Sequence, residues 1–317
     1  VVALPPNDGN YAAEFMDNFR TDLKPLEIVQ PEGPSFNVAG NEVSWQKWNF
    51  RVGFTPREGL VLYTISYEDQ GRKRPIIYRA SLGDMVVPYG DPSPRNIRKN
   101  AFDVGEYGIG NLANSLTLGC DCLGQIYYFD AALNDSRGKA VQIQNAVCLH
   151  EEDFGILWKH VDWRTGKAEV RRSRRLVVSF ISTVGNYEYG FFWYFYQDGH
   201  IEFQVKLTGI VNNAAVDSQE FPKYGTLIAP QLAAHIHQHF FSIRLDMSVD
   251  GLNNSVYEVN TKADPKGPGN PQGNAFYAEQ TLLATELEAQ RTVDPLSGRY
   301  WLISNPSVQN QLGLPVS

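Results

Sequence analysis

The sequence predicts a mainly β protein, a large β-sandwich preceded by a short linker. Runs of alternating apolar and polar residues recur along most of the chain, which is the pattern of strands with one buried face. Aromatic and β-branched residues dominate these runs, and Gly, Pro, Asn and Asp separate them. Many short strands joined by turns are typical of a sandwich, so we expect a linker at residues 1–34 and a β-sandwich domain at residues 35–317.

The first part of the chain changes from linker to strands. Residues 1–34 are interrupted by proline and by Asp8-Gly9, with one short helical stretch at residues 11–19. Residues 95–119 are the least strand-like, with a short helix expected at residues 95–102, and such irregular segments often carry function above a rigid sheet. Strands are expected on either side, at residues 43–54, 60–67, 74–80, 125–129, 141–150 and 155–161.

Two hairpins are expected in the second half. The clearer one joins residues 190–196 to residues 200–210 through Gln197-Asp198-Gly199, because an Asp-Gly turn between alternating runs favours a hairpin. The other joins residues 240–249 to residues 255–259 through Asp250-Gly251. Strand segments at residues 286–293 and 298–303 complete the pattern.

Composition and charge restrict the partners. The chain has 317 residues, 43% of them hydrophobic, and a formal net charge of -7, so we expect no nucleic acid partner. No apolar run reaches the roughly 18 residues of a spanning helix, and the first residues lack the charged region of a signal peptide. We therefore expect a soluble protein with no membrane partner, whose compartment the sequence does not name.

Three cysteines are present, Cys120, Cys122 and Cys148. An odd number leaves at least one thiol unpaired, so at most one disulfide forms. The residues alone leave a second interpretation open, in which all three are buried thiols in a reducing compartment.

Three histidines, His235, His237 and His239, alternate with other residues, so on a strand they would face one side. At about 3.3 Å per residue the outer Cα atoms would lie roughly 13 Å apart, and neighbouring ones about 7 Å apart. Because metal–nitrogen bonds are about 2 Å long, we expect two ligands from this segment and a third from elsewhere. A cluster of imidazoles that binds no metal is the alternative.

Tyr187 lies between two apolar runs, in Ser182-Thr183-Val184-Gly185-Asn186-Tyr187-Glu188-Tyr189-Gly190. A phenol with a pKa near 10 is a poor redox group. Tyr189 follows two residues later, on the same face of a regular strand. Two structural tyrosines in an aromatic strand are the alternative.

Together these segments resemble the copper-containing amine oxidases, whose members convert a tyrosine into the cofactor topaquinone. The resemblance extends from about Lys24 to the last residue. It rests on Thr183-x-x-Asn186-Tyr187-Glu188-Tyr189, His237-x-His239, Gln30-Pro31-Glu32-Gly33-Pro34-Ser35-Phe36, Phe54-Thr55-Pro56-Arg57-Glu58-Gly59-Leu60, Val87-Pro88-Tyr89-Gly90-Asp91-Pro92 and Arg244-Leu245-Asp246-Met247.

The resemblance implies a role for each site residue. Tyr187 would become topaquinone, and Asn186 and Tyr89 would position its ring. Asp103, in Asn100-Ala101-Phe102-Asp103-x-Gly105-Glu106-Tyr107, matches the base that takes a proton from the α-carbon of the amine.

The copper site is the part that the resemblance leaves incomplete. His237 and His239 would hold the ion, since imidazoles suit Cu(II). The family uses a third histidine further along, and this sequence has no motif for it, so the catalytic domain looks incomplete.

Other implied features lie outside this centre. The family's catalytic domain is a β-sandwich called the supersandwich, smaller domains precede it, and full-length members are homodimers. Asp246 and Met247 match a peripheral site for calcium, a cation that prefers oxygen ligands. Cys122 and Cys148 match a disulfide of the family. Ala101 replaces an aromatic gate of some members, which indicates a wider entrance.

We therefore predict an oxidase that converts a primary amine and O₂ into an aldehyde, H₂O₂ and ammonia. A truncated, non-catalytic fragment is one alternative, favoured by the missing third histidine. The other is a metal-binding β-sandwich hydrolase, for which the sequence contains neither an HExxH-type helix nor a nucleophile motif.

Overall fold

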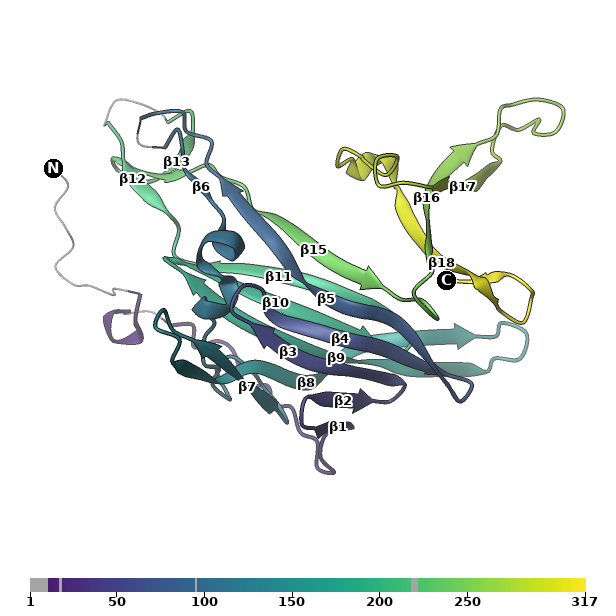
Figure 1. Cartoon of the computed structure of the whole chain (residues 1–317), viewed down its shortest axis with the longest axis horizontal. Helices are drawn as coiled ribbons and strands as arrows, with labels where there is room; N and C mark the ends of the chain where they lie inside the picture. The colour runs from purple at the N-terminus through teal and green to yellow at the C-terminus, as the bar shows by residue number, and fades with distance from the viewer. Residues whose placement is uncertain (1–10, 17–18, 95, 218–221) are drawn as a thin grey trace. The chain divides into compact units, whose positions relative to one another are not determined.

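The computed structural model describes residues 11–16, 19–94, 96–217 and 222–317, and most of these residues lie in antiparallel strands (Figure 1). The predicted mainly β class is confirmed. Helical structure in these ranges is confined to single turns, none of which is long and apolar enough to cross a bilayer. The turns are η1 (Ala13–Phe15), η2 (Asp103–Tyr107), η3 (Ile109–Leu112) and η4 (Pro295–Ser297).

Backbone contacts divide the chain into two units, which are described separately below. The first unit comprises the described residues up to Ser35 together with Phe54–Leu60 and Leu82–Ser242. The second comprises Phe36–Gly53, Val61–Ser81 and Ile243–Ser317.

The first unit is centred on a five-stranded antiparallel sheet of order β11-β10-β9-β8-β7 (Figure 1). Phe180 and Phe191 are register partners across β9 and β10, both are buried, and their rings stack 4.9 Å apart. Such cross-strand aromatic pairs stabilise a sheet. The strands are β7 (Tyr127–Asn134), β8 (Ala140–Val161), β9 (Ala168–Val184), β10 (Tyr187–Tyr196) and β11 (Ile201–Gly209).

Two tight turns frame β10. Gly185 (φ +62°) and Asn186 connect it to β9, and Asp198 and Gly199 (φ +95°) connect it to β11. Both glycines adopt the left-handed region, which a residue without Cβ reaches without strain. The predicted hairpin is confirmed, and the first turn makes Tyr187 the first residue of β10.

A smaller sheet of the first unit leads into the histidine segment. It has the order β12-β14-β13 and consists of β12 (Asn213–Ala215), β13 (Gly225–Ala229) and β14 (Leu232–His235).

Strands of the second unit enclose a core of large apolar side chains. Trp45, Trp48 and Phe50 are almost fully buried in it, as are Leu62 and Ile65. One sheet has the order β1-β2-β3-β4-β5-β15, and a second has the order β17-β16-β18-β19. Their bounds are β1 (Phe36–Ala39), β2 (Glu42–Trp45), β3 (Trp48–Thr55), β4 (Gly59–Asp69), β5 (Arg72–Pro88), β15 (Phe240–Met247), β16 (Ser255–Ala263), β17 (Phe276–Leu283), β18 (Tyr300–Gln309) and β19 (Pro315–Val316). The last residues of β5 belong to the first unit, where they pair with β6 (Asn100–Ala101).

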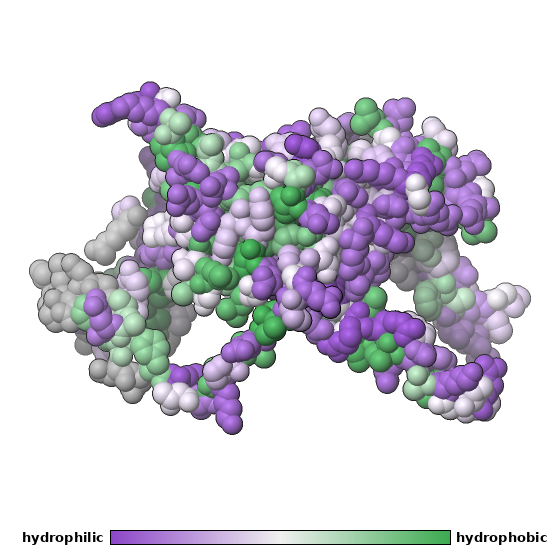
Figure 2. Space-filling view, turned by 90° about the horizontal axis from the view of Figure 1, so that it is seen from below, coloured by the Kyte–Doolittle hydropathy of each residue, from purple (hydrophilic) through white to green (hydrophobic). Residues whose placement is uncertain are grey.

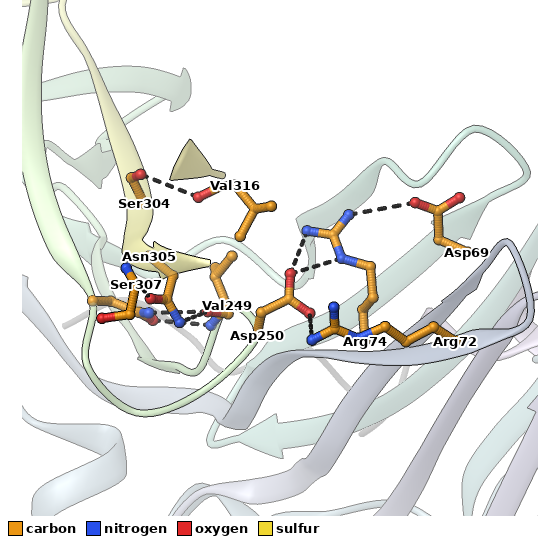
Figure 3. Close-up of polar contacts among 10 residues, drawn as sticks. Asp69, Arg72, Arg74, Val249, Asp250, Ser304, Asn305, Ser307 and Val316 are labelled. Atoms are coloured by element: carbon orange, nitrogen blue, oxygen red, sulfur yellow. Dashed lines mark hydrogen bonds and ion pairs between the residues drawn. The ribbon is translucent and has the colours of Figure 1, made fainter. Parts of the chain in front are cut away.

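A buried carboxylate anchors the turn after β15. The side chain of Asp250 is 1% exposed, and the Arg74 guanidinium donates to its Oδ2 from Nε at 2.8 Å and approaches it with Nη2 at 2.7 Å (Figure 3). Arg72 lies 3.6 Å from the other carboxylate oxygen. Next to this turn, the Asn305 amide donates to the Val249 carbonyl at 3.0 Å. The turn at Asp250 is therefore fixed by charge as well as by glycine. The hairpin expected around it is wrong, because β15 lies beside β5 whereas β16 pairs with β17 and β18 in another sheet.

The surface is mostly hydrophilic but carries apolar patches, as one face shows in Figure 2. In the first unit, the outer part of the β8–β9 hairpin exposes large apolar side chains, among them Trp158 (50%) and Trp163 (89%). Exposed patches of this kind are typical of surfaces that bind another molecule.

Three further predicted elements differ from the structure. Residue 95 lies outside the described residues. From residue 96 on, the stretch expected to be a helix at 95–102 is a turn followed by β6. The backbone N–H of Tyr89 donates to the Lys99 carbonyl at 3.1 Å, which holds this stretch beside the chain at Tyr89. Residues 286–293 are not a strand. The Thr285 hydroxyl accepts from the Glu288 N–H at 3.3 Å and the Glu288 carboxylate accepts from the Ala284 N–H at 3.0 Å, contacts that favour a turn. Of the stretch 11–19, only η1 is helical, and residues 17–18 lie outside the described residues.

Candidate active site

Tyr187 and Tyr189 project from the start of β10 toward the histidine segment. Being two residues apart on a regular strand, they share one face. The Tyr187 hydroxyl lies 3.2 Å from Nε2 of His237, and the Tyr189 hydroxyl lies 3.2 Å from Nδ1 of His239. The fold thus joins two tyrosines and two histidines that are far apart in the sequence.

The histidine segment is not the continuous strand that its spacing predicted. β14 ends at His235, His237 forms an isolated bridge with Tyr89, and His239 precedes β15. The break allows Nδ1 of His237 to donate to the His235 carbonyl at 2.8 Å. Because a carbonyl only accepts, Nδ1 carries the proton, and Nε2 keeps its lone pair toward Tyr187.

The rings of His237 and His239 lie 4.9 Å apart, close enough for both to reach one metal ion. Burial lowers the pKa of His239, and the nearby His237 adds to this effect, so the ring stays neutral and able to bind a metal. Two imidazoles fit the ligand preference of copper. Within the described ranges, no group of three or more His, Cys, Asp or Glu residues converges, so this part of the chain offers two protein ligands.

Tyr89 closes the other side of Tyr187. Its hydroxyl lies 3.4 Å from that of Tyr187, and its ring stacks on His237 at 4.8 Å. Burial raises the pKa of Tyr187, and the hydrogen bond with Tyr89 raises it further. Tyr187 is therefore a neutral phenol held between a second phenol and an imidazole.

Asp103 begins the turn η2 and is 3% exposed. Burial raises the pKa of its carboxyl, the Tyr189 hydroxyl opposes this shift by donating to Oδ2 at 3.5 Å, and the charge of Glu106 adds to it. A carboxyl with a raised pKa inside a cavity is the usual form of a general base that works near neutral pH.

Tyr187 and Tyr189 line two cavities. One, of about 410 Å³, also contains Asp103, Tyr89 and Asn186. The other, of about 240 Å³, also contains His237 and His239. A ring at position 187 therefore faces a carboxyl in one cavity and imidazoles in the other.

Polar contacts hold the turn that carries Tyr187. The Thr183 hydroxyl donates to both oxygens of Glu188, at 2.8 and 2.9 Å, and the Asn114 amide donates to Glu188 at 3.3 Å. The exposed Asn186 amide donates to the Ile210 carbonyl. Asn186 lines the larger cavity, but none of the contacts seen joins its amide to the Tyr187 ring.

The remaining predicted site residues lie elsewhere. In the second unit, Asp246 is exposed and Met247 is half-buried at the end of β15, and the calcium assignment stays a prediction. In the first unit, Cys122 and Cys148 are buried in one cluster with Leu116. All three cysteines are free thiols in this structure, so the disulfide also stays a prediction.

Sequence reasoning gave no role to Asn114 or Lys99. Asn114 supports Glu188 across 74 positions of sequence, and Lys99 lines the larger cavity. No local pattern signals either contact, although both residues lie in the irregular segment that was expected to carry function.

Comparison with known proteins shows the family to which this sequence is similar. Residues 37–317 match the family model described as copper amine oxidase, enzyme domain. The chain is 56% identical to diamine oxidase (copper-containing) 1, peroxisomal, of Nicotiana tabacum, covering 99% of this chain and 41% of that protein. It is 55% identical to the histamine oxidase of Arthrobacter globiformis, covering 99% of this chain and 46% of that protein.

A solved structure of a copper-containing amine oxidase has a similar fold. The copper-containing benzylamine oxidase from Hansenula polymorpha matches with a TM-score of 0.87 at 40% identity, covering 96% of this chain and 48% of that one. The neighbour agrees with the β-sandwich predicted from the sequence. The chain spans about half the length of the relatives that it matches.

Proposed function

The chain belongs to the copper amine oxidase family, and from this premise we propose that the protein carrying it oxidises a primary amine to an aldehyde. In this reaction the amine loses two electrons and two hydrogens, O₂ takes them up as H₂O₂, and water replaces the nitrogen, which leaves as ammonia. The contact of 3.2 Å between the Tyr187 hydroxyl and Nε2 of His237 carries the proposal, since it sets a phenol beside a potential metal ligand.

Three residues would provide the copper ligands and the precursor of the quinone. His237 and His239 would hold copper, and Tyr187 would be the precursor of topaquinone. When bound, copper and the quinone supply the electron sink and the O₂ chemistry that ordinary side chains lack.

Asp103 would remove a proton from the α-carbon of the amine. It shares a cavity with Tyr187, and the Tyr189 hydroxyl restricts the orientation of its carboxyl. Its raised pKa makes it a stronger base than an exposed aspartate, while burial keeps competing water away.

Tyr89 and Asn186 would position the ring of residue 187. Tyr89 does so through the hydroxyl contact at 3.4 Å and its stacking on His237. Asn186 precedes the ring directly, and its bond to the Ile210 carbonyl restrains the turn.

The proposed partners are the primary amine, O₂ and a second copy of the full-length protein. Exposed Trp158 and Trp163 on the β8–β9 hairpin support a homodimer, because aromatic residues are enriched in interfaces. A calcium ion at Asp246 and Met247 is part of the same proposal, as oxygen ligands suit it.

A non-catalytic role is the second candidate. It is favoured by one observation, that the described residues bring only two metal-binding imidazoles together. In that case the protein would contain unmodified Tyr187 and oxidise no amine.

Phenylhydrazine labelling distinguishes the two candidates. The protein is expressed with copper, treated with phenylhydrazine and digested. We expect a coloured adduct on the peptide that contains Tyr187, absent from Tyr187→Phe and retained in the control Tyr78→Phe, an exposed tyrosine of β5. A colourless peptide of unmodified mass from the copper-loaded protein would reject the oxidase.

A further inference from the structure

The cavity beside Tyr187 contains charge at two places. Among the described residues that line it, Asp103 is the only acidic residue and Lys99 the only basic one. The others near Tyr187 are aromatic, aliphatic or amide side chains, such as Tyr107, Leu112 and Asn212. A molecule in this cavity therefore meets a buried carboxyl and an ammonium group.

Lys99 is held in place by Tyr89. Its Nζ lies 4.1 Å from the centre of the Tyr89 ring, within the range of a cation–π contact. Its backbone carbonyl also accepts from the Tyr89 N–H at 3.1 Å. Since the Tyr89 hydroxyl touches that of Tyr187, one aromatic ring separates the ammonium from the reacting position.

From this placement we propose that Lys99 selects the substrate class, favouring primary amines with a neutral or carboxylate-bearing far end over diamines. The inference rests on the proposed amine oxidation. The reacting amino group must approach Asp103 and Tyr187, so the other end of a diamine brings a second positive charge toward Lys99. Two like charges in a partly desolvated cavity repel, and the lining residues include no second carboxylate to offset this.

Lys99 is exposed to solvent on one side, so the effect is moderate. We expect discrimination of roughly two- to fivefold, the range of a partly screened charge pair. It should decrease as salt rises, because the Debye length falls from about 10 Å at 0.1 M to about 3 Å at 1 M.

Three amines with the same reacting end test the proposal. Hexylamine, 1,5-diaminopentane and 6-aminohexanoate share five methylenes and an amino group and differ in the charge of the far end. kcat/KM is measured for each with the copper-loaded wild type, Lys99→Glu, Lys99→Gln and Lys99→Arg, after the quinone content of each is matched by phenylhydrazine titration. Lys206→Glu is the matched control, because Lys206 also lies over a ring, that of Phe192 at 4.0 Å, but does not line the cavity.

The wild type and Lys99→Arg should prefer hexylamine and 6-aminohexanoate over the diamine. Lys99→Gln should reduce that preference by roughly threefold, and Lys99→Glu should reverse it. A ratio that stays within about twofold of wild type in Lys99→Glu, or that shifts equally in Lys206→Glu, would overturn the proposal.

Binding to metal-free protein keeps this test separate from the oxidase proposal. Calorimetric titration of the same amines should show the same order of affinity, reversed by Lys99→Glu. Without turnover of any amine the oxidase proposal fails, and the calorimetry still decides whether Lys99 discriminates by charge.

Discussion

The Tyr187 hydroxyl lies 3.2 Å from Nε2 of His237, whose other nitrogen donates to the His235 carbonyl. The second contact determines the first, because it fixes the proton on Nδ1 and turns the free lone pair toward the phenol. Burial raises the pKa of Tyr187, so a neutral hydroxyl faces that lone pair in the metal-free protein. A copper ion bound at Nε2 would therefore lie next to the phenol.

Replacing either histidine should remove copper and quinone together. We expect His237→Ala and His239→Ala to lower copper content more than tenfold, since each removes one of two imidazoles. The measurements are copper per chain by elemental analysis and the phenylhydrazine adduct. The exposed His160 of β8 gives the control His160→Ala, which should keep both. Normal copper in His239→Ala would refute its role as a ligand.

Asp103→Asn should separate cofactor formation from turnover. The amide has nearly the same shape but cannot accept the proton, so kcat/KM should fall by about 10²- to 10⁴-fold. Phenylhydrazine should still label residue 187, because Asp103 and the two imidazoles line different cavities beside Tyr187. The substitution therefore leaves the imidazole cavity unchanged. Loss of the label in this variant would instead assign Asp103 to cofactor formation.

Tyr189→Phe should shift the pH dependence of the reaction. The Tyr189 hydroxyl lowers the pKa of Asp103 by donating to its carboxylate, against the larger effect of burial, which raises it. Without that donor the pKa of Asp103 rises further, so the carboxylate is reached only at higher pH. The acid limb of kcat/KM should move to higher pH, whereas Tyr194→Phe, whose hydroxyl donates to Gln204, should leave it in place.

Two features of this site could be predicted from the sequence because each depends on a local pattern. Asp198-Gly199 predicted the hairpin, and the spacing of the three histidines predicted that two neighbouring imidazoles converge, as those of His237 and His239 do. The same spacing gave the wrong backbone, because periodicity does not reveal that Tyr89 bridges His237 and interrupts the strand.

Contacts between distant segments could not be derived in this way. Tyr189 meets Asp103 across 86 positions, and Lys99 reaches the cavity only because β6 folds back beside β5. These contacts depend on the packing of whole sheets, which no sequence window contains. The roles of Asp103 and Tyr89 came from family resemblance for the same reason.

Asp250→Asn should destabilise the second unit. The side chain of Asp250 is 1% exposed and that of Arg74 is 22% exposed, so the amide would leave a largely buried guanidinium with only the more exposed carboxylate of Asp69, 3.7 Å away, as a counter-charge. We expect the free energy of unfolding to fall by about 2–4 kcal/mol, below the largest values because Arg74 keeps some solvent. Asparagine tolerates the backbone φ of +50° at this position, so backbone strain would not account for a loss of stability in this variant.

Chemical denaturation followed by fluorescence measures this change. The exposed Arg20–Asp22 pair, with side chains 72% and 66% exposed, is the control, and Asp22→Asn should have no measurable effect. A double-mutant cycle with Arg74→Met should give a coupling energy. Additive effects would mean that the pair does not act as a unit.

Cys122 and Cys148 should form a disulfide under oxidising conditions. Their side chains already lie in one buried cluster, whereas Cys120 is exposed. The bond would close the loop between β8 and the segment before β7, and chain entropy gives a stabilisation of roughly 3 kcal/mol. Non-reducing peptide mapping should find the two cysteines joined, and Cys148→Ala should lower the denaturation midpoint of oxidised protein. Cys120→Ser is the control and should change neither result; a bridge that includes Cys120 would show that the packed thiols do not determine the pairing.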